Sequence, residues 1–161
     1  MPNVAIAIGQ SLPAGTLHEG SPGNQHDPAT LFASGKHVLF AVPGAFTPTC
    51  SAKHLPGFVE KADEIKAKGV DKIVCMAVND AFVMNAWGKD QNVGDKVEMI
   101  ADGNGDLTRA LGLSLDATGF GLGERGQRFA FVANDGVIEQ LFVEEGGAFQ
   151  VSSAENVINH L

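Results

Sequence analysis

The 161-residue sequence contains no tyrosine and one tryptophan, and positive charge is scarce. The absence of tyrosine excludes a tyrosine general acid or radical. Lys and Arg total 11 against 19 Asp and Glu, and the resulting net charge of -8 argues against a nucleic-acid partner, because phosphates repel an acidic surface. No apolar run is long enough to span a membrane or to form a signal peptide, so we expect a cytoplasmic protein without a membrane partner.

Cysteine is also rare, with Cys50 and Cys75 as its two occurrences. They form neither a C-x-x-C pair nor a disulfide framework, and the five histidines form no H-x-x-x-H pattern. A thioredoxin-type dithiol is disfavoured for the same reason. The sequence predicts a reactive or buried thiol, and nothing in it indicates a metal or another cofactor.

What the sequence does contain is an alternation of strand-like and helical patterns, which we interpret as one domain over residues 1–161. Strands are predicted near 14–18 (weakly) and at 38–42, 72–78, 97–101, 129–133 and 137–143. Helices are predicted near 28–32, at 51–68, after Asn79-Asp80 (carrying Phe82, Val83, Ala86 and Trp87), at 107–111 and from Ser152 onward. Parallel βαβ units followed by a hairpin and a last helix predict an α/β fold, a thioredoxin-like sandwich with a central mixed β-sheet flanked by helices.

One stretch organises the rest of the chain. The apolar strand 38–42 is followed by a proline-rich turn, and then by a helical pattern over 51–68 that Pro56 should bend or divide. The turn places Cys50 on the first turn of this helix, where free N–H groups and the positive end of the helix dipole favour a thiolate. Cys50 is therefore a candidate nucleophile.

The turn carries a resemblance. Residues 43–50, Pro-Gly-Ala-Phe-Thr-Pro-Thr-Cys, resemble the peroxidatic motif of the peroxiredoxins. Residues 54–58, 78–83, 101–102 and 152–155, with Trp87 and Arg128-Phe129, are similar to the type II, peroxiredoxin-5-like branch. The resemblance covers roughly residues 9–161. It implies a thioredoxin-like fold, reduction of hydrogen peroxide and organic hydroperoxides, and a homodimer that contacts through loops on the active-site face.

Four residues are expected to form the peroxidatic site. Attack of a thiolate on a peroxide builds negative charge on both ends of the transition state, and fixed donors stabilise this charge. We expect the Thr47 hydroxyl to face the thiolate and the attacked oxygen. The resemblance brings Arg128 beside Cys50, where a guanidinium would stabilise the thiolate and polarise the peroxide, although Arg125 and Arg109 are rivals. Pro43 should shield the sulfur from water.

A resolving cysteine is missing from the place where some type II members have one, because Val151 occupies that region and no cysteine follows Cys75. We interpret Cys75 as an inert core residue. The sequence therefore predicts a one-cysteine mechanism, in which an external thiol recycles the Cys50 sulfenic acid, with glutathione or glutaredoxin ahead of thioredoxin.

Four alternatives can be weighed against this interpretation. His54 could be a general base or metal ligand, but we favour a hydrogen-bonding residue near the pocket mouth. Residues 121–126 match G-x-G-x-x-G but lead into a strand, so we interpret them as a flexible loop near the active site. Residues 102–106 start like a calcium loop, yet leucines occupy its glycine and glutamate positions. Cys50 could also serve a redox-sensing module that is oxidised without efficient turnover.

Overall fold

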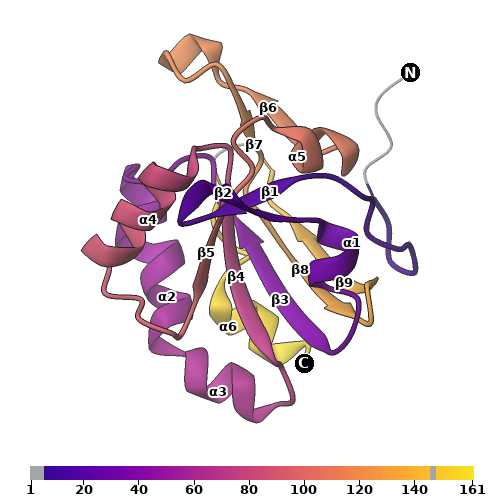
Figure 1. The fold of residues 1–161 in the computed structure, drawn as a ribbon. Coiled ribbons are helices and arrows are strands. Elements are labelled where there is room, and N and C mark those ends of the chain that lie inside the picture. Colours follow the sequence, from indigo (N-terminus) through magenta and orange to yellow (C-terminus); the bar gives the residue numbers. More distant parts are fainter. Residues whose placement is uncertain (1–5, 146–147) are drawn as a thin grey trace.

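The core of the protein is a mixed seven-stranded sheet (Figure 1). The computed structural model describes residues 6–145 and 148–161. The strand order is β2-β1-β5-β4-β3-β8-β9, in which β3, β4 and β5 are parallel and the other neighbours are antiparallel. The strands are β1 (Leu17–Glu19), β2 (Ser21–His26), β3 (Lys36–Ala41), β4 (Lys72–Ala77), β5 (Glu98–Ala101), β8 (Phe129–Asn134) and β9 (Val137–Val143). The predicted central mixed sheet is confirmed.

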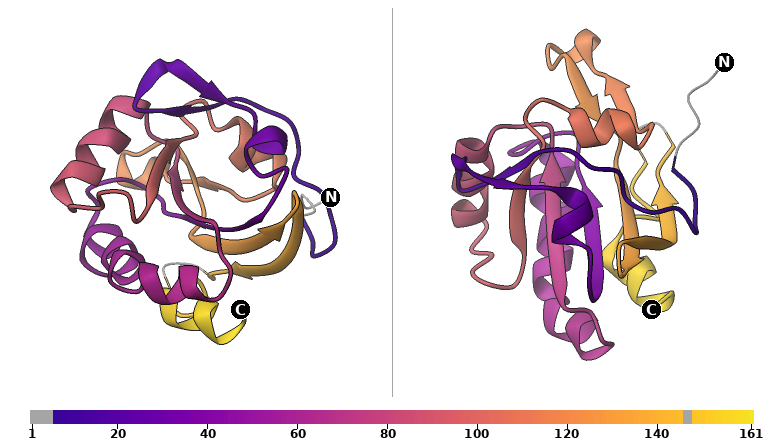
Figure 2. Two further views of the ribbon diagram at one scale, coloured as in Figure 1. Left: turned by 60° about the horizontal axis from the view of Figure 1, so that its bottom comes forward. Right: turned by 45° about the vertical axis from the view of Figure 1, so that its right-hand side comes forward.

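Helices cover both faces of this sheet (Figure 2). One face packs against α2 (Leu55–Glu60), α3 (Ala62–Ala67), α4 (Ala81–Asp90) and α6 (Ala154–Asn159), and the other against α1 (Pro28–Leu31) and α5 (Asp106–Ala110). Strand β3 shows why two cores form: Val38 and Phe40 belong to the first cluster, and Leu39 to the second. Since side chains alternate along a strand, a central strand covered on both faces must be apolar throughout, as the sequence predicts.

The segment after the first strand differs from the prediction. Residues 21–26 were predicted as loop because they contain proline and glycine. They form β2 at the edge of the sheet, paired with β1. An edge strand tolerates proline because one side of its backbone needs no partner strand. Gly20, with φ of +76°, makes the reversal between the two strands possible.

A small hairpin was also missed. Strands β6 (Ser114–Asp116) and β7 (Glu124–Gly126) pair with each other outside the main sheet, and the short 3₁₀ turn Thr118–Phe120 lies between them. The hairpin projects from the top of the molecule in Figure 1 and in the right-hand view of Figure 2. The interpretation of residues 121–126 as a loop is therefore wrong for 124–126. Three-residue strands are too short to leave a recognisable period in the sequence.

The helical stretch after Cys50 is divided, as Pro56 predicts. A π-helical turn over Cys50–His54 precedes α2, and the Leu55 N–H bonds the Cys50 carbonyl across five residues. A second break at Lys61 separates α2 from α3. Four apolar residues at helical spacing in this segment are fully buried, namely Leu55, Phe58, Ala62 and Ile65, and Val59 is partly buried. Gly69 ends the segment with φ of +93°.

Helix α4 begins after Asp80, as predicted, but of the four apolar residues named for it only Trp87 is buried. Its buried residues are Ala81, Met84, Trp87 and Gly88, whereas Phe82 is 63% exposed and Ala86 is exposed. The helix start is fixed by Asp80, whose side chain accepts a hydrogen bond from the Val83 N–H.

Candidate active site

The turn between β3 and the π-helical turn is held by a side chain from the neighbouring strand. Asn79 follows the carboxyl end of β4, and its Oδ1 accepts a 2.9 Å hydrogen bond from the Ala45 N–H. Phe46 has φ of +63°, a conformation that costs a bulky residue free energy and persists only where the surroundings enforce it. The turn is thus shaped by its tertiary contacts.

Thr47 and Pro43 both lie in this turn, half-buried. The Thr47 hydroxyl donates a 2.7 Å hydrogen bond to the Gly44 carbonyl, and so closes the turn. The Pro43 carbonyl accepts a 3.4 Å bond from Arg125, which reaches it from β7. The proposed actions of Thr47 on the peroxide and of the Pro43 ring as a shield remain predictions.

Cys50 is completely buried, unpaired and in contact with a cation. The helical conformation begins at Pro48, which places the cysteine in the first turn. Its Sγ accepts a 3.2 Å hydrogen bond from Nη2 of Arg128, which is itself 9% exposed. Arg128 reaches this position because it directly precedes β8, and Phe129 of β8 pairs with Ala41 at the end of β3. Of the three arginines considered, Arg128 is the one that contacts the sulfur.

His54 supports that arginine rather than the sulfur. Its ring is fully buried, its Nδ1 lies 2.8 Å from Nη1 of Arg128, and its Nε2 lies 2.9 Å from the Ser152 carbonyl. Because a guanidinium only donates, Nδ1 accepts and Nε2 carries the proton. Burial first, and then the charge of Arg128, lower the pKa of His54 to about 3, although the bond to Ser152 and the charge of Glu144 oppose the change. A neutral imidazole with both nitrogens engaged is a hydrogen-bonding residue, as the sequence interpretation favours.

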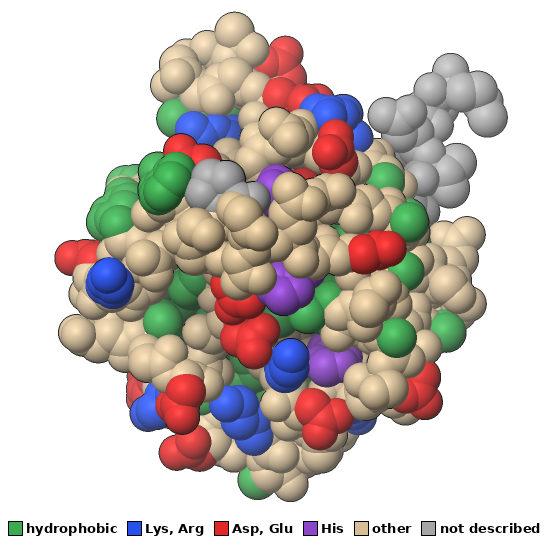
Figure 3. Space-filling model, viewed as in Figure 1, with side chains coloured by type: hydrophobic (Ala, Val, Ile, Leu, Met, Phe, Trp, Pro, Cys, Tyr) green, Lys and Arg blue, Asp and Glu red, His purple; other side chains and the backbone are tan. Residues whose placement is uncertain are grey.

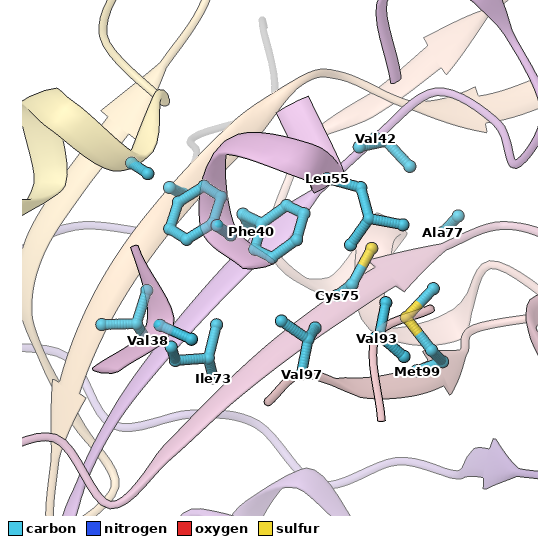
Figure 4. Packing of buried hydrophobic residues seen from close by; sticks show 14 of the residues in the cluster. Val38, Phe40, Val42, Leu55, Ile73, Cys75, Ala77, Val93, Val97 and Met99 are labelled. Carbon is cyan, nitrogen blue, oxygen red and sulfur yellow. The ribbon is translucent and has the colours of Figure 1, made fainter. Parts of the chain in front are cut away.

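Cys75 lies in the apolar core. It sits on β4, fully buried, and Figure 4 shows its side chain between those of Leu55 and Val97. Burial, reinforced by Cys50 and opposed by Arg128, raises the pKa of Cys75 well above its ordinary value. This thiol therefore stays protonated and is a poor nucleophile.

Other polar side chains near the site are engaged structurally. The Asp102 carboxylate accepts hydrogen bonds from the Leu107 N–H, the Thr108 N–H and the Thr108 hydroxyl, at 3.2, 2.8 and 2.6 Å, so it caps α5.

Within residues 6–145 and 148–161, no group of three or more His, Cys, Asp or Glu side chains could hold a metal ion. Charged side chains of both signs are intermixed on the face seen in Figure 3. No helix in the described part of the chain is long and apolar enough to cross a membrane.

Three contributors to the site were not recognised as such in the sequence. Asn79 was assigned only to a helix start, and Ser51, whose Oγ accepts a 3.0 Å bond from Trp87 Nε1, was given no role. Phe149 lies with its ring 4.9 Å from that of His54 and 5.8 Å from Cζ of Arg128. A polar residue directly after a buried parallel strand is a signal that could have pointed to Asn79, since such residues gather at the same sheet edge as the candidate nucleophile.

Comparison with known proteins agrees with this geometry. Residues 7–158 match the Redoxin family. The chain belongs to the Redoxin family. Reduced Prx3 of Vibrio vulnificus, solved in complex with hydrogen peroxide, is 51% identical to this Redoxin-family chain with a TM-score of 0.92, covering 97% of it and 99% of Prx3.

Two plant relatives show to which group within the Redoxin family the chain belongs. Peroxiredoxin-2E-2, chloroplastic, of Oryza sativa subsp. japonica is 53% identical over 163 residues, which cover 97% of this chain and 72% of the relative. Peroxiredoxin-2B of Arabidopsis thaliana is 50% identical over 159 residues, which cover 97% and 98% of the two chains. Within the Redoxin family this chain is a peroxiredoxin, with the thioredoxin-like fold and thiol peroxidase function of that group.

Proposed function

We propose that the chain reduces hydrogen peroxide and organic hydroperoxides with Cys50 as its one catalytic cysteine. The observation that carries this proposal is the 3.2 Å contact between Arg128 Nη2 and Cys50 Sγ, because a permanent cation favours the sulfur as a thiolate. The thiolate attacks one peroxide oxygen, an S–O bond forms as the O–O bond breaks, and hydroxide or an alkoxide leaves. Sulfur is oxidised to a sulfenic acid, and the peroxide is reduced.

An external thiol completes the cycle. It condenses with the sulfenic acid, releases water and forms a mixed disulfide, and a second thiol then reduces this disulfide to restore Cys50. The buried, protonated state of Cys75 supports this one-cysteine scheme. A small thiol reaches a buried sulfur with less rearrangement than a protein disulfide reductase needs, so we favour glutathione with glutaredoxin over thioredoxin.

Coupled turnover assays test the scheme. Peroxide consumption with glutathione, glutaredoxin and glutathione reductase should be lost in Cys50→Ser and retained in Cys75→Ser. Loss of turnover in both variants, or turnover with thioredoxin alone, contradicts it. Multiple turnovers identify an enzyme, whereas a single stoichiometric oxidation identifies a redox sensor.

We further propose a cytoplasmic homodimer. Three phenylalanines support self-association, since Phe46, Phe82 and Phe120 are 53%, 63% and 86% exposed. Phe46 lies in the turn that precedes Cys50, so a dimer contact that covers Phe46 would form on the active-site face. Light scattering that finds a stable monomer at micromolar concentration contradicts the dimer. Cell fractionation tests the compartment, with a plastid as the other outcome, because the rice relative is named chloroplastic.

A further inference from the structure

Glu144, directly after β9, is a buried carboxylate that forms no ion pair within the described residues. It is 5% exposed, and its Oε2 accepts hydrogen bonds from the Gln150 N–H, the Ser152 N–H and the Ser152 hydroxyl, at 2.7, 2.8 and 2.7 Å. Burial raises the pKa of Glu144, but these bonds and one from the Val151 N–H outweigh it and leave the pKa lowered. Three donors on one oxygen hold residues 150–152 in place.

The segment held by Glu144 leads to the sulfur through hydrogen bonds. The Ser152 carbonyl accepts the Nε2 proton of His54, which leaves Nδ1 as an acceptor for Arg128. With its Nη1 engaged there, Arg128 directs Nη2 to Cys50 Sγ. The Glu144 N–H also donates a 3.0 Å bond to the carbonyl of Arg128, so the same residue holds the backbone of the arginine.

Phe149 connects to the same segment. It lies next to Gln150, whose N–H is bonded by Glu144, and its ring packs near His54 and Arg128. A ring in this position limits the access of water to the guanidinium, and a drier environment strengthens the attraction between the guanidinium and a thiolate.

We propose that Glu144 is a positioning residue of the peroxidatic site, which acts through Ser152 and His54 to direct Arg128 at Cys50. The proposal rests on the peroxidase chemistry proposed for Cys50. The hydrogen bonds of the Glu144 carboxylate go to Gln150 and Ser152 rather than to Cys50, so its effect is transmitted by orientation.

The direction in which the thiolate titration of Cys50 shifts when Glu144 is replaced distinguishes a positioning role from a simple charge effect. A nearby negative charge opposes a thiolate, so removing Glu144 as a charge alone would favour the thiolate and move its titration to lower pH. Removing it as a positioning residue loosens Arg128 and moves the titration to higher pH. A merely structural role lowers the melting temperature and leaves the titration of the folded protein unchanged. Among the described residues, the titratable and charged groups linked to Cys50 are Arg128, which contacts its sulfur, His54, which contacts Arg128, Glu144, whose charge acts on His54, and Cys75, whose thiol interacts with both Cys50 and Arg128.

The experiment compares Glu144→Ala with Glu144→Gln in a Cys75→Ser background, following the ultraviolet absorbance of the Cys50 thiolate against pH. We expect Glu144→Ala to move the midpoint up by about one pH unit and, well below both midpoints, to slow oxidation by hydrogen peroxide about tenfold. Glu144→Gln should show a smaller upward shift, because its amide oxygen still accepts hydrogen bonds. Glu145→Ala, which removes an exposed carboxylate one residue away, should leave the midpoint unchanged.

An unchanged or lowered midpoint in a Glu144 variant that keeps its circular dichroism spectrum overturns the proposal. If Glu144→Ala does not fold, the direction of the shift in Glu144→Gln decides it. The thiolate titration does not depend on turnover. A parent protein that fails to reduce peroxide therefore contradicts the proposed function, whereas an unshifted titration contradicts the role of Glu144.

Discussion

Acidification should destabilise this protein through one residue, His54. Its ordinary pKa of 6.5 applies to the unfolded chain, and burial together with Arg128 lowers the folded value to about 3. Between these two values the unfolded state binds a proton that the folded state does not, so folding stability falls as the pH falls. This direction is the opposite of that for a histidine whose pKa is raised by a carboxylate partner.

The magnitude follows from the two pKa values. Each pH unit well inside the window costs about 1.4 kcal/mol, and integration from about pH 7.5 to about pH 5 gives a loss of about 2 kcal/mol from His54 alone. Glu144 contributes little in this range: its pKa is lowered from 4.5, so the stability it provides is lost mainly as the pH falls through that value and below it.

Urea unfolding of the reduced protein at the two pH values measures this loss, with the fluorescence of Trp87 as the signal. His54→Gln removes the titrating group, so its difference in unfolding free energy between the two pH values should be smaller than the parent's by about 2 kcal/mol. His160→Gln, which removes an exposed imidazole, is the matched control and should keep the parental difference. Equal pH dependence in the parent and His54→Gln would refute the assignment of a buried, neutral His54.

Two further predictions concern the residues on either side of Cys50 in the sequence. Asn79→Ala leaves the Ala45 N–H without its acceptor and should slow oxidation by hydrogen peroxide about tenfold with a stability loss of about 1 kcal/mol, whereas Asn79→Asp, which keeps an acceptor oxygen, should retain most of the rate in stopped-flow measurements. Equal rates for Asn79→Ala and the parent would contradict this account of the turn. The indole N–H of Trp87 donates a hydrogen bond to Ser51, the residue after Cys50. Peroxide should therefore change the fluorescence emission of Trp87 in the Cys75→Ser variant but not in the Cys50→Ser variant. The same change in both variants would show that the fluorescence change does not arise from oxidation of Cys50.

Much of the fold was predictable because it depends on local patterns. The strands that became β3, β4 and β8 are continuous apolar runs, and a strand buried on both faces must be one. The hairpin between β8 and β9 was predictable from Asp135-Gly136, since both residues adopt positive φ there. Strand β2 was missed because its stability comes from pairing with β1, and the β6–β7 hairpin was missed because its three-residue strands leave no recognisable period.

The sequence alone predicted the candidate nucleophile and its immediate frame: Cys50 at a helix start, after a turn of prolines and Thr47, with Arg128 suggested by the family resemblance. The tertiary structure decided how these parts are held. Asn79, His54 and Glu144 come from separate elements, and each holds a different part of the site by side-chain hydrogen bonds: Asn79 holds the turn before Cys50, His54 holds Arg128, and Glu144 holds the segment that ends at Ser152. Such bonds depend on the orientation of side chains brought together from distant positions, and no local period or spacing in a sequence encodes that orientation.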